Sequence, residues 1–166
     1  MFAHQKEAAM ILSGQAHTVA PGAGRIADLG IARMRLLAAT DTTPGRAFAA
    51  AEFTGSPGPW TVPHLHRGLE ESFFVLDGDF VFTVGEDDIA AEPGAFVVVP
   101  RGTRHLLAAG PAGGRCLVVW VPGGLEQMFL ELADLGPDAI RNPSVRAAVA
   151  AKYDSVPVTG DTTVEP

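Results

Sequence analysis

The feature that most constrains this chain is a series of short apolar segments separated by glycine and proline turns. The chain has 19 glycines and 13 prolines among its 166 residues, a high proportion of turn-forming residues. Such turns limit most segments to lengths that are typical of strands. The predicted strands are 31–39, 46–54, 60–66, 72–76, 80–84, 89–91, 96–99, 105–109 and 116–121. Short strands at near-regular spacing predict an all-β sandwich or barrel.

The pattern changes after residue 124, where two helices are predicted. Four apolar residues recur at the spacing of one helix face: Leu125, Met128, Phe129 and Leu132. This helix is expected to end at the Gly-Pro pair 136–137. Asn142 followed by Pro143 is typical of a helix N-terminus, and the second helix is predicted to continue through Lys152.

We expect residues 1–166 to form a single domain, because the helical part is too small to bury a core of its own easily. The barrel would span about 31–122, and a helical extension of about 125–153 would pack on its outside. A further short helix is predicted over 2–12, and the polar tail from Asp154 onwards is expected to be loose.

The charge and cysteine content argue against several classes of partner. Twelve basic and nineteen acidic side chains give a formal net charge of −7. A chain with this charge is poorly suited to bind the row of phosphates in a nucleic acid, so no nucleic-acid partner is expected. The single cysteine, Cys116, rules out an intrachain disulfide and a cysteine zinc cluster. No apolar run is long enough to span a bilayer, and the start of the chain does not resemble a signal peptide. We therefore expect a cytoplasmic protein with no membrane partner.

Three histidines and one glutamate lie in two glycine-framed segments. His64 and His66 are two positions apart on a predicted strand, so their side chains point to the same face. Glu71 follows them, and His105 opens a later strand. Neutral imidazole nitrogens and a carboxylate oxygen are ligands of divalent first-row metals. Because hydrogen bonding alone would not require this set to converge, the four residues are predicted to hold one metal ion.

These two segments resemble the two sequence motifs of the cupin superfamily. The first runs over 58–78 and the second over 94–105, with Gly58, Gly78, Gly94, Pro100, Gly102 and the four candidate ligands at the family spacing. The resemblance implies a double-stranded β-helix, that is, a jelly-roll barrel with the metal held inside. The remaining sequence is similar to small bacterial single-domain cupins that are often compared with quercetin dioxygenase.

The sequence departs from the second motif at one position, where Ala109 replaces the usual asparagine. Alternation along the strands places several apolar side chains on the same face as the candidate ligands. The predicted substrate pocket is therefore apolar and is formed by Phe73, Val75, Leu107 and Ala109. Glu70 is an alternative ligand to Glu71, but the distance to Gly78 along the chain favours Glu71.

Three functions follow from these features. The favoured one is a metal-dependent dioxygenase that acts on a hydrophobic or aromatic enol-type small molecule, with Glu71 as a catalytic base. The second is a cyclase or isomerase that uses the ion as a Lewis acid, and the third is a non-catalytic small-molecule-binding barrel. The ligand set admits Fe, Mn, Ni, Co, Cu or Zn.

Residues outside this set receive simpler interpretations. Phe74 and Leu76 are expected to face away from the barrel interior, which favours a homodimer unless the helix after residue 124 covers them. Cys116 is predicted to be a buried apolar residue, and Glu52 an exposed strand position. The remaining residues are read as exposed: His4, His17, Arg67, Arg101 and Arg104.

Overall fold

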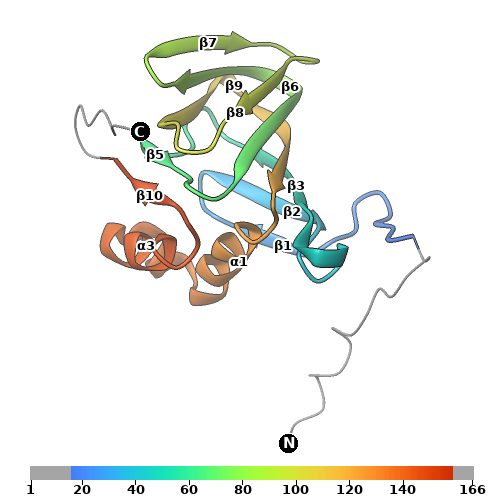
Figure 1. The fold of residues 1–166 in the computed structure, drawn as a ribbon. Coiled ribbons are helices and arrows are strands. Elements are labelled where there is room, and N and C mark those ends of the chain that lie inside the picture. The colour runs from blue at the N-terminus through green and yellow to red at the C-terminus, as the bar shows by residue number, and fades with distance from the viewer. Residues whose placement is uncertain (1–15, 159–166) are drawn as a thin grey trace, which may run out of the picture.

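The computed structural model describes residues 16–158, in which strands form a barrel and helices gather at one end of it (Figure 1). The elements before the first motif are β1 (Ile26–Asp28), β2 (Ala32–Ala38), the short 3-10 helix η1 (Pro44–Arg46) and β3 (Ala49–Gly55). The strands that follow are β4 (Gly58–Pro59), β5 (His64–Leu65), β6 (Glu70–Val84), β7 (Asp87–Ala91), β8 (Phe96–Val99) and β9 (His105–Val121). The last elements are α1 (Glu126–Leu135), α2 (Pro137–Arg141), α3 (Pro143–Ala150) and β10 (Val156–Pro157).

Two long strands, β6 and β9, form the centre of the barrel and pair antiparallel from one end to the other. The sequence predicted a turn in the middle of each, at 77–79 and 110–114, and this prediction is wrong. Gly78 has a φ of +72°, and a Cβ atom there would collide with the backbone of Gly113 on the paired strand. The glycines thus bend the two strands together, through shifts in register, without ending them.

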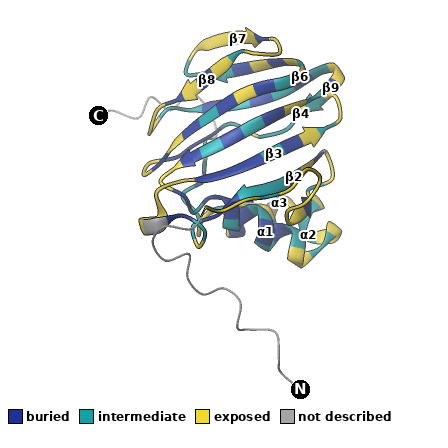
Figure 2. Ribbon diagram, turned by 90° about the vertical axis from the view of Figure 1, so that its right-hand side faces the viewer, coloured by how far each residue is buried: buried dark blue, intermediate teal, exposed yellow. Residues whose placement is uncertain are grey.

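The two halves of β6 and β9 belong to opposite sides of the barrel. The first half of β6 pairs with β8, and the second half pairs with β7. The second half of β9 continues through β3 and β2 to β1. Buried and exposed residues alternate along β6 and β9 (Figure 2), as expected for strands with one face toward a core. The predicted all-β jelly-roll barrel is therefore confirmed.

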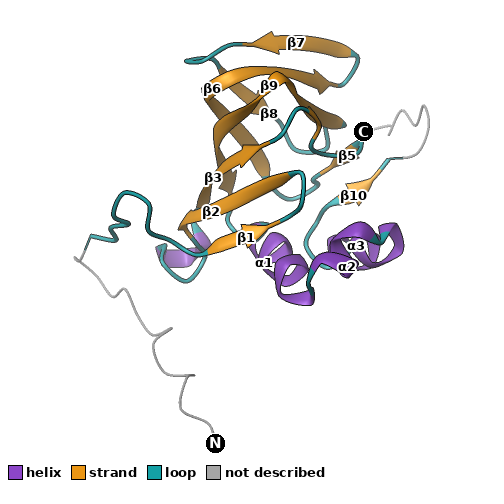
Figure 3. Ribbon diagram, turned by 180° about the vertical axis from the view of Figure 1, so that it is seen from behind, coloured by secondary structure: helices purple, strands orange, loops and turns teal. Residues whose placement is uncertain are grey.

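The helices pack at the end of the barrel that carries β1 (Figure 3). The helix predicted after residue 124 is present as α1, and its Phe129 ring lies 5.3 Å from that of Phe53 and 5.7 Å from that of Trp120. The N-cap prediction for α3 is also confirmed, since the Asn142 side chain accepts a hydrogen bond from the Ser144 N–H at 3.0 Å. The sequence did not predict α2, because Gly136 and Pro137 end one helix and begin the next without a loop between them.

The prediction of a loose tail is wrong for residues 154–158. In this segment β10 pairs antiparallel with β5, and the Val158 N–H donates to the Pro63 carbonyl at 3.0 Å. The C-terminal segment therefore returns to the strand that carries the first histidine of the candidate site. The helix predicted over 2–12 lies outside the described residues. Within 16–158, no helix is both long and apolar enough to cross a membrane.

Candidate metal centre

Four buried side chains from three strands and a loop converge inside the barrel. His64 lies on β5, His66 follows it, Glu71 lies on β6 and His105 begins β9. Each offers one ligand atom, and these atoms all lie within 4.8 Å of one another. The pairing of His64 with His105 brings the two motifs together across neighbouring strands. The structure thus assembles the four residues that the sequence singled out.

The backbone orients all three imidazoles in the same way. The Nδ1 atoms of His64, His66 and His105 lie 2.7, 2.7 and 2.9 Å from the carbonyl oxygens of Val62, Asp154 and Thr103, respectively. In each of these pairs only the imidazole can donate, so Nδ1 carries a proton and Nε2 is the ring nitrogen that points into the centre. Metal-binding histidines are commonly oriented by such hydrogen bonds.

The Glu71 carboxylate is oriented from both sides. Its Oε1 accepts a hydrogen bond of 2.6 Å from the Trp120 indole N–H. Its Oε2 lies 2.9 Å from the His105 Nε2 and 3.4 Å from the His66 Nε2. The His66 Nε2 is buried and has no hydrogen-bond partner. A buried polar atom without a partner is costly. A cation bound by the His66 Nε2 would remove that cost. The donor set therefore fits a divalent transition metal.

Burial and the Glu71 charge together set the protonation of the centre. Burial, reinforced by His105, lowers the pKa of His64 from 6.5 to about 4, which keeps this imidazole neutral at pH 7. Burial also disfavours ionised Glu71, but the neighbouring His105 and His66 imidazoles outweigh it and hold the pKa of the carboxyl well below its usual range. Burial opposes protonation of His66, yet the nearby Glu71 carboxylate raises the pKa of His66. The centre thus presents one carboxylate charge to a cation.

Two residues that support the centre were missed by the sequence reasoning. Trp120 holds Oε1 of Glu71 from the far part of β9. The Asp154 backbone carbonyl accepts a hydrogen bond from the His66 Nδ1–H, and the Asp154 carboxylate accepts hydrogen bonds from the Arg67 and Gly68 N–H groups at 2.9 and 2.7 Å. Both lie far from the ligands along the chain, so no local pattern indicated them.

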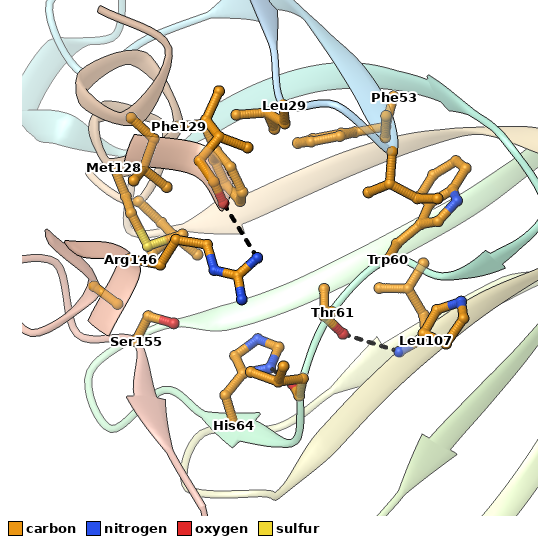
Figure 4. Close-up of a pocket in the computed structure, with 18 of the residues that line it drawn as sticks. Leu29, Phe53, Trp60, Thr61, His64, Leu107, Met128, Phe129, Arg146 and Ser155 are labelled. Carbon is orange, nitrogen blue, oxygen red and sulfur yellow. Dashed lines mark hydrogen bonds between the residues drawn. The ribbon is translucent and has the colours of Figure 1, made fainter. Parts of the chain in front are cut away.

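The centre adjoins a cavity of about 750 Å³ between the barrel interior and the helices α1 and α3 (Figure 4). Of the predicted pocket residues, Phe73 and Leu107 line this cavity, whereas Val75 and Ala109 are buried but do not line it. The Phe82 ring packs against that of Phe73 at 4.9 Å and fills part of the barrel interior. The sequence also missed the contribution of the helices. Their lining residues include Leu125, Met128, Phe129, Leu132, Ile140, Arg146, Ala147 and Ala150.

The alternative ligand Glu70 and the strand residue Glu52 both lie outside the ligand set. Glu70 is exposed, and its Oε1 lies 3.3 Å from the Arg101 Nε. Glu52 was expected to be exposed, but it is partly buried, with its Oε2 3.1 Å from the Arg35 Nη2. Glu71 is therefore the acidic side chain that belongs to the centre.

The other residues singled out by the sequence lie apart from the ligand set. Cys116 is buried, as predicted, and burial raises the pKa of its thiol to about 12. Arg67 and His17 are exposed, as predicted, whereas Arg104 is partly buried. His4 lies outside the described residues.

Comparison with known proteins agrees with this geometry. The cupin domain family matches residues 51–122. Quercetin 2,3-dioxygenase from Bacillus subtilis (strain 168) is 31% identical over 100 residues, which cover 60% of this chain and 29% of that enzyme. The match thus spans less than a third of the length of this curated relative.

Several solved structures share the fold. KdgF from Halomonas sp. has a TM-score of 0.58 at 18% identity, covering 65% of this chain and 94% of that one. An RmlC-like cupin from Shewanella frigidimarina NCIMB 400 has a TM-score of 0.55 at 17% identity, covering 66% and 93% of the two chains. At such identities the likeness concerns the fold alone.

The sequence match and the site geometry fall on the same part of the chain. Both glycine-framed segments lie within the matched residues 51–122, and their side chains meet at one buried centre. Residues 51–122 therefore match the cupin domain family in sequence, and the chain resembles quercetin 2,3-dioxygenase over 100 residues.

Proposed function

We propose that this protein is a metal-dependent dioxygenase that acts on a hydrophobic or aromatic enol-type small molecule. The observation that carries the proposal is the position of a buried three-histidine, one-carboxylate donor set beside a large apolar cavity. Its volume of about 750 Å³ is in the range of small-molecule sites. The 31% identity to quercetin 2,3-dioxygenase supports oxygen chemistry over other reactions.

The metal would be held by His64, His66, Glu71 and His105, all of which fit it by donor type and orientation. A divalent ion with four protein ligands keeps coordination positions open, lowers the pKa of a hydroxyl bound to it and, when redox-active, exchanges electrons with dioxygen. Iron, manganese, nickel, cobalt, copper and zinc all accept these ligands.

Side chains of the protein would orient the substrate, exclude water and transfer the proton. Phe73 and Leu107 line the cavity with apolar surface, which orients a ring and excludes water. Glu71 is proposed as the base once its carboxylate loosens from the metal, with Oε2 then taking the proton of the enol hydroxyl as the O–H bond breaks. Trp120 holds the other carboxylate oxygen, so that Oε2 remains directed at the centre.

A Lewis-acid cyclase or isomerase is the second candidate. It is favoured by the buried Glu71, because an oriented carboxylate beside an ion is sufficient for proton transfer without oxygen. A barrel that only binds a small molecule would use the same cavity without turnover.

Oxygen uptake distinguishes these functions. The protein would be loaded separately with iron, manganese, nickel and cobalt and mixed with flavonols and 1,3-diketones in an oxygen electrode. We expect oxygen consumption with at least one metal, and its loss in the Glu71→Gln variant. If enols bind but no metal-loaded form consumes oxygen, the dioxygenase proposal fails, and product analysis decides between isomerisation and binding alone.

A further inference from the structure

We propose that Arg146 is a specificity residue that binds a carboxylate on an otherwise apolar substrate. The inference rests on the proposed function only in taking the cavity to be the substrate site. It adds a chemical class to that substrate, namely an amphipathic monoanion, and it assigns the recognition to helix α3 and not to the barrel.

The position of Arg146 supports this role. Its side chain reaches from α3 into the cavity, on the side where Met128, Phe129 and His64 also line it (Figure 4). Its Nη1 donates a hydrogen bond of 3.2 Å to the carbonyl of Ile140, the residue just before the end of α2. Arg146 is an exposed residue, so its head can reach both the cavity and solvent. A guanidinium has five N–H donors, so most of them remain available to a ligand.

The charge of Arg146 is not compensated by the protein. Within residues 16–158, no carboxylate oxygen lies within 4 Å of its side-chain nitrogens. Arg141, the other cation that lines the cavity, is paired with Asp138 at 2.6 Å. The only acidic residue in the described lining is Glu71, which Trp120 and the histidines engage. The chain as a whole is acidic, with a net charge of −7, so an unpaired cation in this cavity is not a result of general basicity.

The surroundings of Arg146 explain why its partner should be a carboxylate on an apolar body. Most of the cavity wall is aliphatic and aromatic, which favours the burial of an apolar molecule. A carboxylate matches the planar guanidinium with two parallel hydrogen bonds and is a better partner than a neutral hydroxyl. The competing interpretation is that the Arg146 stem only covers apolar surface while its head is solvated. That interpretation predicts no preference for anions.

Calorimetric titration of matched probes tests the proposal. The probes are 4-phenylbutyrate and 4-phenyl-1-butanol, which share a ring and chain but differ in charge. They would be titrated into metal-free and zinc-loaded protein, so that any bond between the carboxylate and the ion is measured separately. The variants are Arg146→Gln and Arg146→Lys, with Arg141→Gln as the matched control because it removes a cation that is already paired.

In the wild type we expect the acid to bind about tenfold more tightly than the alcohol, a ratio typical of one charge-assisted hydrogen-bonding partner. Arg146→Gln should abolish the preference, Arg146→Lys should keep part of it, and Arg141→Gln should keep all of it. Absence of acid binding to the wild type, equal binding of the two probes, or a preference that persists in Arg146→Gln would overturn the proposal.

The outcome of the oxygen-uptake experiment does not depend on the outcome of this titration. Arg146-dependent acid binding without oxygen consumption would leave the carboxylate site standing and remove the dioxygenase. Conversely, oxygen consumption with an enol, together with a titration that shows no Arg146-dependent preference for the acid over the alcohol, would support the dioxygenase and remove the role proposed for Arg146.

Discussion

Each histidine of the centre uses both of its ring nitrogens. Nδ1 is bound to a backbone carbonyl, and this leaves Nε2 directed at the other ligands. The orientation therefore depends on backbone segments, such as Val62 and Thr103, that carry no functional side chain. This arrangement makes the centre preorganised: the imidazoles need not rotate for a metal to bind.

The first prediction concerns metal content. Replacing His66 or His105 with alanine removes one donor from a set of four and should lower the bound metal at least about tenfold. His17→Ala is the control, since His17 is exposed and bonds only to the Leu37 carbonyl. Elemental analysis of the purified variants measures the effect, and circular dichroism should show the same β-rich spectrum in all of them. Unchanged metal in both centre variants would refute the ligand assignment.

The spacing of the two glycine-framed segments was sufficient to predict which four side chains converge, but it could not predict what orients them. Trp120 and Asp154 reach the centre from distant parts of the chain, through pairing that local sequence does not encode. Strand alternation correctly placed Val75 and Ala109 inside the barrel. It could not show that they lie away from the cavity, because that depends on how large side chains such as Phe82 pack.

Among the elements, the segment that ends in β10 connects the helices to the centre. Asp154 has a φ of +57°, and both its carbonyl and its carboxylate bind the stretch 66–68. A left-handed backbone disfavours most side chains but is tolerated by asparagine. Substitutions at this one position can therefore separate the loss of the carboxylate from a change in backbone conformation.

We expect Asp154→Ala to weaken metal binding about tenfold, because without the carboxylate, and with alanine disfavoured in a left-handed backbone, the segment would shift and move its backbone carbonyl away from His66. Asp154→Asn keeps the backbone preference and one acceptor oxygen, so its affinity should stay close to that of the wild type. Competition with a chelator of known affinity measures both variants. Wild-type affinity in the alanine variant would mean that β10 pairing alone holds the segment.

A second inter-element contact involves Glu126, the first residue of α1, whose side chain is fully buried. Its carboxylate accepts hydrogen bonds from the Thr40 N–H and hydroxyl at 3.0 and 2.9 Å and from the Gly124 N–H at 2.6 Å. It therefore ties the loop after β2 to the start of α1.

Glu126→Ala should lower the free energy of unfolding by about 2 to 4 kcal/mol, because several donors would lose their acceptor inside the protein. Glu86→Ala, in the exposed turn between β6 and β7, should change it by less than about 0.5 kcal/mol. Urea unfolding followed by circular dichroism compares them. A Glu126 variant as stable as the Glu86 variant would show that water replaces the carboxylate.

The elements themselves were predictable to different degrees. Apolar periodicity was sufficient to predict α1, and the Asn-Pro pair was sufficient to predict the start of α3. The length of β6 and β9 was not predictable, since glycine signals a turn in an isolated strand but a shared bend in two paired strands. The pairing of β10 was also hidden, because a two-residue strand carries no periodicity.

At the scale of the whole molecule, the helices close one end of the barrel and leave the outer face of β6, β8 and β9 uncovered. Phe74 on β6 pairs in register with Phe96 on β8, and their exposed fractions are 37% and 61%. Leu117 continues the row on β9. Val98, 52% exposed, lies on β8 two residues after Phe96. The helix α1 packs near β1 and β3 and does not cover this row.

The last prediction is that this apolar row forms the interface of a homodimer. A contiguous apolar patch on a sheet face is normally covered by a partner, and a two-fold axis would bring the same row of each copy together. Light scattering at micromolar concentration should give twice the mass of 17.3 kDa. Phe96→Glu should convert the protein to a monomer, because it places a charge on each side of the interface. Phe48→Glu is the matched control, since Phe48 is 40% exposed but lies outside this row, and it should remain dimeric. A wild-type monomer, or a Phe96 variant that remains dimeric, would exclude this face as the interface.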